Sequence, residues 1–451
     1  MILLQKGKTL ALPTNKEIWK LTYPIILGLF AENIIGVTDT VFLARVGEIQ
    51  LGAAAIGSTF YIILFIIGLG FSIGTQIIIS RRLGEKKERE VGGVFEISVI
   101  FLLLIAVIVF VLVKLLFSSV FVHILSSREI FEQTDLYIKI RIWGVFFTFL
   151  GCAFRALYTG IFRTKILMIN AVILAGVNIV FAYLLIFGKF GFPRMGLEGA
   201  AIATVIAEAV SVMFYILASP RFVDLKKFGF FRSKSYNFKV IRTIIDVSGF
   251  IILQSVISLV SWFVFFLVIE QRGQHQLAIT NIIRSVYLFL MIPGWAFSSA
   301  TSTMVSNIIG KGERDAVIPL IRKISFLCFL SIIVLVIPAF VFHNAVLSLY
   351  TSDALLIRES LPSYYVVMLA LVVFSITINF FNGVTGTGST RVSLLIELAG
   401  TILYLLFVYF VILVFNMPLE VAWVTEIQYF IVLFVISYIY LKRGSWKKKI
   451  I

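Results

Sequence analysis

The chain repeats one segment at a constant spacing of 226 residues. Residues 47–84 and 273–310 align without a gap and share 13 identities in 38 positions. The shared positions include Gly47/Gly273, Tyr61/Tyr287, Gly68/Gly294, Phe71/Phe297 and Thr75/Thr301. The same spacing later aligns Thr159-Gly160 with Thr385-Gly386. A chain of this kind has to fold into two equivalent halves.

The composition places these halves in lipid. The sequence is 60% hydrophobic with a mean hydropathy of +1.05, and only 14% of its residues are charged. Soluble domains are about 45–50% apolar. A chain of 451 residues with this composition has far more apolar surface than a water-soluble core can enclose. We therefore expect an integral membrane protein.

Twelve long apolar runs predict an all-α fold with twelve transmembrane helices, six in each half. The runs cover residues 18–43, 51–80, 92–115, 137–160, 166–187, 197–219, 246–269, 277–309, 319–343, 363–386, 392–415 and 421–441. An even number of helices per half gives equivalent helices the same direction, which implies a pseudo-two-fold axis along the membrane normal. The expected division is an N-terminal lobe at 1–218, a cytoplasmic linker at 219–245 and a C-terminal lobe at 246–451.

Positive charge is distributed unevenly over the loops. When the first five residues of each run are counted with the connection before them, 28 of the 39 Lys and Arg residues belong to the two termini and the connections after even-numbered runs, and 8 belong to the other connections. This asymmetry predicts that both termini lie in the cytoplasm. It also explains the net charge of +16 without nucleic acid. The N-terminus leads into a full-length run, so we expect an uncleaved first helix. The basic linker either contacts anionic lipid or is solvated.

Residue types that support other functions are sparse. The chain has three histidines and two cysteines, without metal-ligand spacing. Cys152 and Cys328 stand inside apolar runs, which favours core positions over a disulfide. No phosphate-binding loop, nucleophilic constellation or repeated selectivity filter is readable, so an enzyme, a primary pump and a channel are not indicated. We expect no cofactor, no catalytic residue, and a monomer whose partners are a small-molecule substrate and lipid.

Acidic side chains inside the apolar runs are the main functional candidates, because charge within a bilayer is costly. Glu32 and Asp39 stand two turns apart on one face of the first run, and Glu208 stands one turn beyond Thr204 in the sixth. At 1.5 Å per residue, Asp39 and Thr204 lie about 10 Å from the outer boundary. The same count places Glu32 and Glu208 about 16 Å in, with Asn178 at about 13 Å. The five side chains are expected to share one cavity.

This cavity suits a coupling cation. Two acids in one dry cavity cannot both ionise cheaply, so one of them is expected to exchange a proton near the working pH. Ionised carboxylates with Asn and Thr oxygens would also suit Na+, so the coupling ion is left open between H+ and Na+. Glu397 and Glu426 stand near the ends of the eleventh and twelfth runs, where we expect their side chains to reach the adjacent interface.

Further polar residues of the apolar runs are candidates for a substrate cleft, namely Gln254, Asn281, Arg284, Asn379 and Asn382. Arg284 either pairs with an acid or faces the cleft and attracts anionic groups. Pro24 in the first run and Pro293 in the eighth lack an amide hydrogen, so each marks a candidate hinge, static or moving.

Several short motifs together resemble the multidrug and toxic compound extrusion (MATE) family of transporters. They are Pro24, Thr38-Asp39-Thr40, Gly47, Leu51-Gly52-Ala53-Ala54, Gly84-Glu85-Lys86, Gly196-Leu197-Glu198-Gly199-Ala200-Ala201 and Gly310-Lys311-Gly312-Glu313. Their order and spacing extend over essentially the whole chain. The resemblance implies an inner-membrane exporter driven by inward H+ or Na+, with two six-helix lobes around a central cleft.

The resemblance also implies roles for particular residues of the N-terminal lobe. It marks Asp39, Asn178 and Thr204 as positions of the coupling site. The family has a second acid four residues after the asparagine, where this chain has Ala182. Glu32, together with Glu208, is expected to supply the missing carboxylate.

The C-terminal half departs from the family pattern. Residues 384–390 lack the arginine and the acid of the corresponding family motif, and Ser258 stands where NorM-like members have glutamate. These departures favour a DinF-like rather than a NorM-like member, with coupling in the N-terminal lobe.

Two functions are consistent with these features. The first is a cation-coupled antiporter that exports drugs or other amphiphilic small molecules by alternating access. The alternative is a flippase for lipid-linked oligosaccharide or another lipid-like substrate, because such proteins also have duplicated lobes. Flippases of this kind tend to have more spans or several cavity arginines, so twelve spans with few intramembrane basic residues favour the exporter.

Overall fold

A computed structural model describes residues 12–231 and 238–448. Twelve helices in this part of the chain are long and apolar enough to cross a membrane, which confirms the predicted fold class. Those of the first half are α1 (Asn15–Ala44), α2 (Glu48–Gly84), α3 (Val91–Ile124), the consecutive α4 (Arg128–Arg141) and α5 (Val145–Gly160), α6 (Lys165–Phe187) and α7 (Gly196–Phe222). Those of the second half are α8 (Phe238–Glu270), α9 (Gln274–Gly310), α10 (Val317–Val341), α12 (Ala354–Gly386), α13 (Thr390–Val408) and α14 (Leu419–Arg443).

Short elements join or extend these helices. They are the 3-10 turns Glu88–Glu90, Ile142–Gly144, Arg314–Ala316 and Ser445–Lys448, the helix α11 (His343–Ser348) and a π-helical turn at Tyr409–Val414 that continues α13. The turn Ile142–Gly144 links α4 to α5, so the two together form one membrane-length segment.

Some helices extend well beyond the apolar runs that predicted them. Helix α3 continues to Ile124 and α4 begins at Arg128, whereas the runs ended at 115 and resumed at 137. The hydroxyl of Ser127 caps α4 by accepting a hydrogen bond from the amide of Ile130 at 3.4 Å. Hydropathy marks the stretch that is apolar enough for lipid, while the backbone hydrogen bonds of a helix continue into polar residues until a cap ends them.

Contacts divide the chain into two compact units. The N-terminal unit comprises Leu21–Ile79 and Lys87–Val256, and the C-terminal unit comprises the chain up to Lys20, Ser80–Lys86 and Ile257–Ile451. The start of α8 therefore belongs with the first half, and the end of α2 belongs with the second. The predicted lobe boundaries at 218 and 246 stay a prediction, and part of the predicted linker, 232–237, lies outside the described residues.

Polar contacts explain why the end of α2 belongs to the C-terminal unit and the start of α8 to the N-terminal unit. In the C-terminal unit, the hydroxyl of Ser80 donates to the carbonyl of Thr303 at 2.8 Å, and the Asn307 amide donates to the carbonyl of Ser80 at 3.0 Å. In the N-terminal unit, the hydroxyl of Ser248 donates to the carbonyl of Phe71 at 3.2 Å. Buried polar groups need such partners in lipid, so these bonds hold each exchanged segment in its unit.

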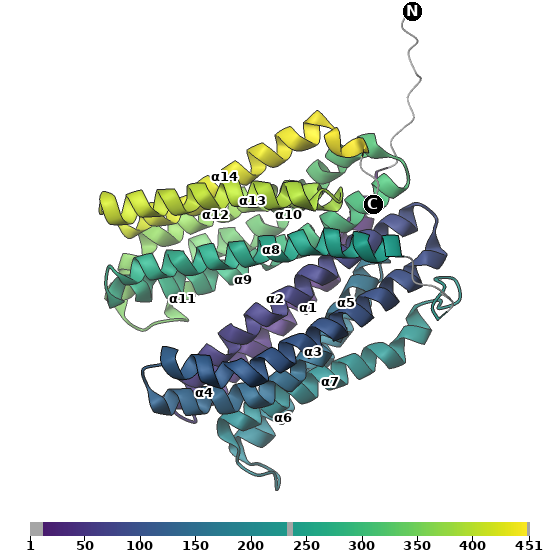
Figure 1. Ribbon diagram of the computed structural model, residues 1–451. Coiled ribbons are helices and arrows are strands. Elements are labelled where there is room, and N and C mark those ends of the chain that lie inside the picture. Colours follow the sequence, from purple (N-terminus) through teal and green to yellow (C-terminus); the bar gives the residue numbers. More distant parts are fainter. Residues whose placement is uncertain (1–11, 232–237, 449–451) are drawn as a thin grey trace, which may run out of the picture. The chain divides into compact units, whose positions relative to one another are not determined.

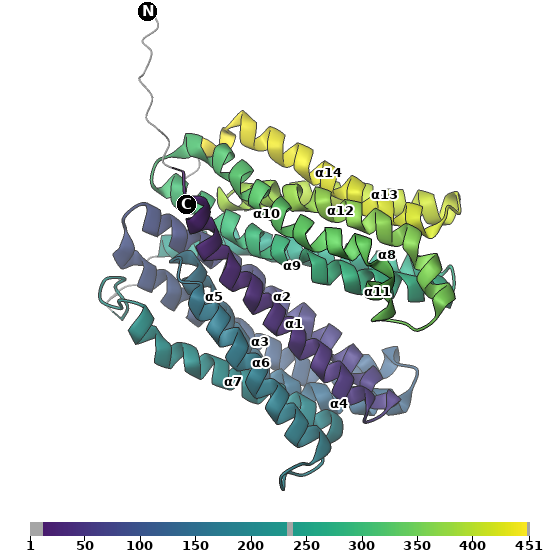
Figure 2. The same cartoon turned by 180° about the vertical axis from the view of Figure 1, so that it is seen from behind.

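Small residues bring α1 and α6 together in the N-terminal unit. Ala31 and Ile35 of α1 pack against Ala171 and Ala175 of α6, and Figure 2 shows the two helices running side by side. The hydroxyl of Thr164 also donates to the carbonyl of Leu21 at 2.8 Å. Alanine side chains allow the two backbones to approach closely. In lipid there is no hydrophobic driving force for helix association, so close van der Waals packing of this kind holds the helices together.

Helix α12 is central to the C-terminal unit. It packs against α9, α10, α13 and α14, an arrangement visible in Figure 1. Glycines permit the close crossings: a Cβ at Gly386 would lie 2.7 Å from the carbonyl oxygen of Ser302, and one at Gly294 would lie 2.2 Å from the ring of Phe374. The side chain of Asp353 caps the helix by accepting from the amide of Leu355 at 2.9 Å.

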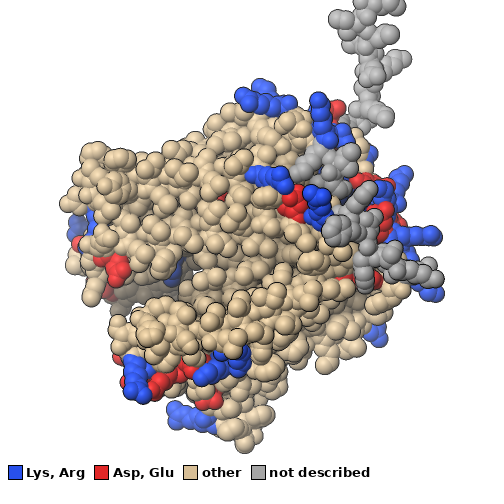
Figure 3. Space-filling view, in the orientation of Figure 1, with Lys and Arg blue, Asp and Glu red and all other residues tan. Residues whose placement is uncertain are grey.

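Charged side chains are distributed as a membrane requires. On the face drawn in Figure 3, the Lys, Arg, Asp and Glu side chains gather near the helix ends, and the surface between them is largely uncharged. Exposed apolar side chains such as Val37, Leu115 and Val334 are 60–68% accessible, which is expected where lipid covers them.

Candidate functional site

An ion pair between Arg141 and Glu208 lies in the interior of the N-terminal unit. The guanidinium of Arg141, at the end of α4, donates to both oxygens of the Glu208 carboxylate on α7, at 2.6 and 2.8 Å. Only 8% of the arginine side chain and 14% of the glutamate side chain are exposed. Two parallel bonds of this kind give the strongest geometry available to an arginine–carboxylate pair.

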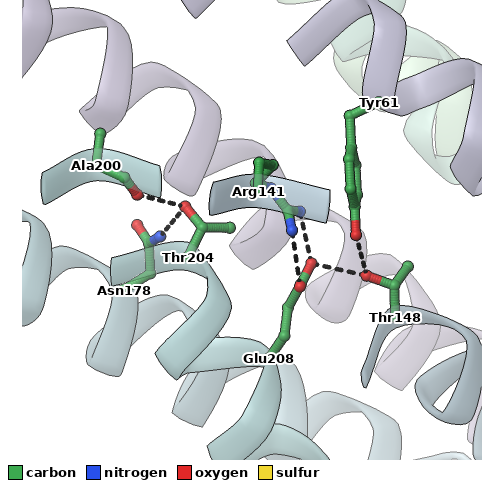
Figure 4. Close-up of polar contacts among 7 residues, drawn as sticks. All are labelled: Tyr61, Arg141, Thr148, Asn178, Ala200, Thr204 and Glu208. Atoms are coloured by element: carbon green, nitrogen blue, oxygen red, sulfur yellow. Dashed lines mark hydrogen bonds and ion pairs between the residues drawn. The ribbon is translucent and has the colours of Figure 1, made fainter. Parts of the chain in front are cut away.

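Neighbouring groups fix the pair in place (Figure 4). The hydroxyl of Thr148 donates to Glu208 at 2.9 Å and contacts the hydroxyl of Tyr61 at 2.8 Å. The Tyr61 ring lies under the guanidinium, with 3.6 Å between its centroid and Cζ of Arg141. The 3-10 turn leaves room for the ion pair because it contains Gly144. A Cβ at this position would lie 2.2 Å from Arg141 and 2.3 Å from Glu208.

A second ion pair joins α1 to α5. Nη2 of Arg155 lies 3.1 Å from Oε1 of Glu32, with 23% of the arginine and 38% of the glutamate side chain exposed. Cys152, one turn earlier on α5, lies within electrostatic range of Glu32, Arg155 and Glu208. The two ion pairs therefore occupy one neighbourhood.

Asp39 has no ion-pair partner among the described residues. Its Oδ1 is enclosed, and no donor among the described residues contacts that atom. The charge of Arg141 acts on Asp39 without a direct contact, and Tyr137 lies within range of Asp39, Arg141 and Glu208. A buried acceptor without a protein donor is rare.

Asn178 and Thr204 form a further polar contact, also drawn in Figure 4. The Asn178 side chain on α6 donates to the hydroxyl of Thr204 on α7 at 3.1 Å, and that hydroxyl donates to the carbonyl of Ala200 at 3.0 Å. Oδ1 of Asn178 is enclosed and, within the described part of the chain, accepts nothing. Two oxygens of the predicted site, one from Asp39 and one from Asn178, thus lack donors.

The structure brings the predicted acids into one neighbourhood but adds two arginines that change their chemistry. Neither arginine was predicted to take part in the site, although both stand in the run 137–160. Helix α4 begins at Arg128 and packs on α7, which brings Arg141 to Glu208. The presence of Arg155 in an apolar run was the usable signal, since a buried cation requires an acid.

The candidates for a substrate cleft have different environments. Gln254 keeps an enclosed Oε1 without a donor among the described residues. Asn281 and Asn382 each donate to a carbonyl of their own helix, at 3.1 and 2.9 Å. Arg284 contacts no acid in the described chain and lies over the Phe266 ring, 5.0 Å from its centroid.

Asn379 is fully buried. Its amide donates to the carbonyl of Ser375 at 2.8 Å, and its oxygen accepts from Thr301 at 2.8 Å. Both ends of the side chain are therefore used within the C-terminal unit. The hinge candidates Pro24 and Pro293 both lie inside continuous helices, α1 and α9.

The expectation that Glu397 and Glu426 reach a membrane interface was wrong. Their side chains are buried, with 2% and 3% of the residue exposed. Glu397 accepts from Tyr429 and from Ser258, the residue at the position where NorM-like members have glutamate. Both cysteines are free and buried, and the described residues include no group of three His, Cys, Asp or Glu side chains that could hold a metal.

Comparison with known proteins assigns the family. The family model described as MatE matches residues 24–184 and 251–422, one stretch in each half. The chain belongs to the MATE family. Its members are transporters, and the MATE chain described here is a multi-pass membrane protein.

Individual relatives are distant in sequence but match over most of the chain. A probable multidrug resistance protein NorM from Thermotoga maritima is 24% identical over 443 residues, which cover 96% of this chain and 94% of that protein. The uncharacterized transporter YisQ from Bacillus subtilis is 24% identical over 322 residues, or 69% of each chain.

Solved structures share the fold of this MATE chain. A MOP superfamily transporter from Pyrococcus furiosus, described as having a binding pocket of reverse polarity, gives a TM-score of 0.88 at 19% identity over 96% of this chain and 97% of that one. An outward-facing multidrug resistance MATE transporter gives 0.89 at 18% identity with the same coverage. At these identities the likeness concerns the fold.

Proposed function

We propose that this MATE chain is a cation-coupled antiporter that exports drugs or other amphiphilic small molecules by alternating access. The family and the names of its relatives support multidrug transport. The outward-facing state described for one similar structure supports alternating access. The distribution of Lys and Arg supports cytoplasmic termini, and the bacterial relatives support a location in the bacterial inner membrane.

Asp39 carries the proposal. Three carboxylates of the N-terminal unit, at Glu32, Asp39 and Glu208, belong to the candidate site, and two of them have an arginine partner. A carboxylate in such a pair cannot take up a proton without leaving the arginine charge uncompensated. Asp39 carries no such constraint, and its enclosed oxygen lacks a donor. Asp39 is therefore the residue whose charge changes during transport.

The same arrangement favours H+ over Na+ as the coupling ion. A Na+ site in this unit would need several oxygen ligands, and Glu32 and Glu208 are occupied by arginine. Asn178 and Thr204 offer two oxygens, but the Thr204 hydroxyl is already engaged with Asn178 and Ala200. A proton needs a single oxygen of Asp39. We propose that Asn178 and Thr204 orient this region, and that Glu32 and Glu208 hold Arg155 and Arg141 in place.

The absence of a glutamate at Ser258 supports a DinF-like rather than a NorM-like member. Primary coupling is accordingly assigned to the N-terminal unit. The flippase alternative gains no support from the intramembrane arginines, because Arg141 and Arg155 are neutralised by acids.

Efflux of a fluorescent organic cation from proteoliposomes tests this function. Purified protein is reconstituted, and a pH gradient and a Na+ gradient are imposed separately. Wild type is expected to transport under the pH gradient, and Asp39→Asn is expected to lose this coupled transport. The matched control is Glu132→Gln, which changes an exposed acid of the same unit that pairs with Arg128.

Each result has a distinct meaning. Efflux driven by Na+ alone would refute the assignment of H+, and intact coupling in Asp39→Asn would refute the role of Asp39. Absence of efflux under both gradients would favour a lipid-like substrate, which the same vesicles test with a fluorescent lipid.

A further inference from the structure

Lys114 is a charged side chain on an otherwise apolar, exposed surface of α3. The neighbouring side chains of Val111, Leu112, Leu115 and Leu116 are 45–68% exposed, as expected where lipid covers them. The Lys114 side chain is exposed together with them. A cation on a lipid-covered surface is costly, so its position requires an explanation.

The position of Lys114 along α3 corresponds to a membrane boundary. Helix α3 begins at Val91, directly after the charged 3-10 turn Glu88–Glu90. At about 1.5 Å per residue, Lys114 lies about 35 Å from that end of the helix. The hydrocarbon core of a bilayer is about 30 Å thick. With the cytoplasmic termini proposed above, Lys114 lies at the headgroup level of the outer leaflet.

Aromatic side chains support the same depth. Trp143, in the turn that follows α4, is 53% exposed, and its ring lies 4.6 Å from that of Phe110 on α3, measured between centroids. The amine of Lys114 lies 5.9 Å from the centroid of each ring. Tryptophan is enriched at the interface between membrane and water. The two rings therefore hold the Lys114 ammonium group at that interface.

Lys114 also lines a small pocket between α3 and α4, two helices that pack against one another (Figure 1). The polar part of the lining consists of Lys114 and Ser118 of α3 and Asp135 and Lys139 of α4. The apolar part includes Phe117 and Ile138. A pocket with a polar and an apolar side matches a molecule that has both.

The polar side of this pocket has an excess of one positive charge. Oδ1 of Asp135 accepts from the hydroxyl of Ser118 at 2.5 Å, and its Oδ2 lies 2.5 Å from the amine of Lys139. The amine of Lys114 donates to the carbonyl of Lys139 at 3.3 Å and contacts no acid in the described part of the chain. Two lysines and one aspartate leave a net charge of +1, which favours an anion.

The surroundings select a lipid among the anions. Lysine binds phosphate as a point charge, and basic residues at the membrane surface attract anionic headgroups. The exposed apolar side chains next to Lys114 offer contacts to acyl chains, which a soluble anion does not have. A zwitterionic headgroup carries its own ammonium group, so the excess positive charge favours a headgroup with a net negative charge.

We propose that Lys114 and Lys139 bind the phosphate of an anionic phospholipid in the outer leaflet, with its acyl chains along the apolar surface of α3. The Lys139 side chain is 53% exposed, so its amine can reach the phosphate while Lys114 approaches from the other helix. This lipid site is independent of the proposed coupling mechanism, because it uses none of the residues assigned to coupling.

Native mass spectrometry of the full chain in detergent tests the proposal. The probe is dioleoylphosphatidylglycerol, and dioleoylphosphatidylcholine and inorganic phosphate serve for comparison. Wild type is expected to bind the glycerol lipid more tightly than the choline lipid. Lys114→Gln is expected to bind it about fivefold more weakly, which corresponds to the contribution of one basic residue near an anionic surface. The matched control is Lys189→Gln, which changes an exposed lysine on the connection between α6 and α7.

Three results would overturn the proposal. Equal affinities of wild type and Lys114→Gln would refute the role of the lysine. Equal affinities of wild type for the two lipids would refute the selection of a negative headgroup. Displacement of the lipid by inorganic phosphate at the same concentration would indicate a site for a soluble anion.

A second variant acts in the opposite direction. Asp135→Asn removes the negative charge and releases the amine of Lys139, so it is expected to bind phosphatidylglycerol more tightly than wild type. Partial unfolding weakens binding in any variant and therefore cannot produce a loss in Lys114→Gln together with a gain in Asp135→Asn. Unchanged or weaker binding by Asp135→Asn would overturn the charge argument.

Discussion

The Arg141–Glu208 pair predicts a specific pattern of stability losses. Glu208→Gln leaves the guanidinium of Arg141 enclosed with its bidentate partner gone. Both side chains are less than 15% exposed, so solvent screens the pair little. Breaking a buried ion pair by removing one partner costs about 3–5 kcal/mol of unfolding free energy. Arg141→Met is expected to fall in the same range, because it leaves the carboxylate without its cation.

The double variant Arg141→Met with Glu208→Leu distinguishes the loss of charge compensation from the loss of side-chain packing. Replacing a whole buried pair with apolar residues ranges from neutral to about 1–4 kcal/mol stabilising. The double variant is therefore expected to regain most of what either single change loses.

Unfolding in detergent, followed by tryptophan fluorescence against denaturant, gives the four free energies of the cycle. Glu132→Gln serves as the control, because its pair with Arg128 is 59% and 92% exposed. Such exposed pairs contribute only about 0–1 kcal/mol. The reasoning fails if Glu208→Gln costs no more than the control, or if the double variant is as unstable as the single variants.

Two further stability predictions follow from the same unfolding assay. Gly386→Ala places a Cβ 2.7 Å from the backbone oxygen of Ser302, which cannot move aside, so the unfolding free energy is expected to fall by about 1–3 kcal/mol. Gly151→Ala serves as the control and should not destabilise the protein, because the space at its Cβ is open. Equal losses in the two variants would contradict the packing argument. Asp353→Ala removes the cap that accepts from the amides of Leu355 and Leu356, with an expected loss of about 1 kcal/mol. An unchanged midpoint would show that water replaces this cap.

The fold could be predicted from the sequence because the lipid bilayer imposes one simple requirement on a spanning segment. A helix that spans the bilayer needs a long apolar run, and all twelve runs proved to be membrane-length helices. The ends were less predictable. Helix α4 starts at Arg128 through its Ser127 cap, nine residues before the apolar run that predicted it.

The same limitation explains the missed arginine. Glu208 was recognised because it interrupts an apolar run, whereas Arg141 stands near the polar start of its run and was not singled out. Its burial depends on how α4 packs on α7, and no pattern within one helix contains that information.

Depth along a helix also misplaced Glu397 and Glu426. Counting residues measures the distance to the membrane boundary, but neighbouring helices decide whether a side chain reaches it. The repeat adds one instructive case. Tyr61 and Tyr287 are equivalent by spacing, and each belongs to the hydrogen-bond network of a buried glutamate, Glu208 or Glu426. The two glutamates are not equivalent, since 218 rather than 226 residues separate them.

The alanine contact between α1 and α6 has a mechanical consequence. Methyl groups of Ala31, Ala171 and Ala175 interlock only shallowly, whereas Phe42, near the end of α1, packs against the rings of Tyr183 and Phe187 of α6. Lipid tails are as apolar as these methyl groups. Exposing the methyl groups to lipid therefore loses van der Waals contacts but incurs no hydrophobic penalty. The part of α1 around Ala31 can therefore shift against α6 at little energetic cost, while the aromatic contact of Phe42 fixes the end of the helix that carries Asp39.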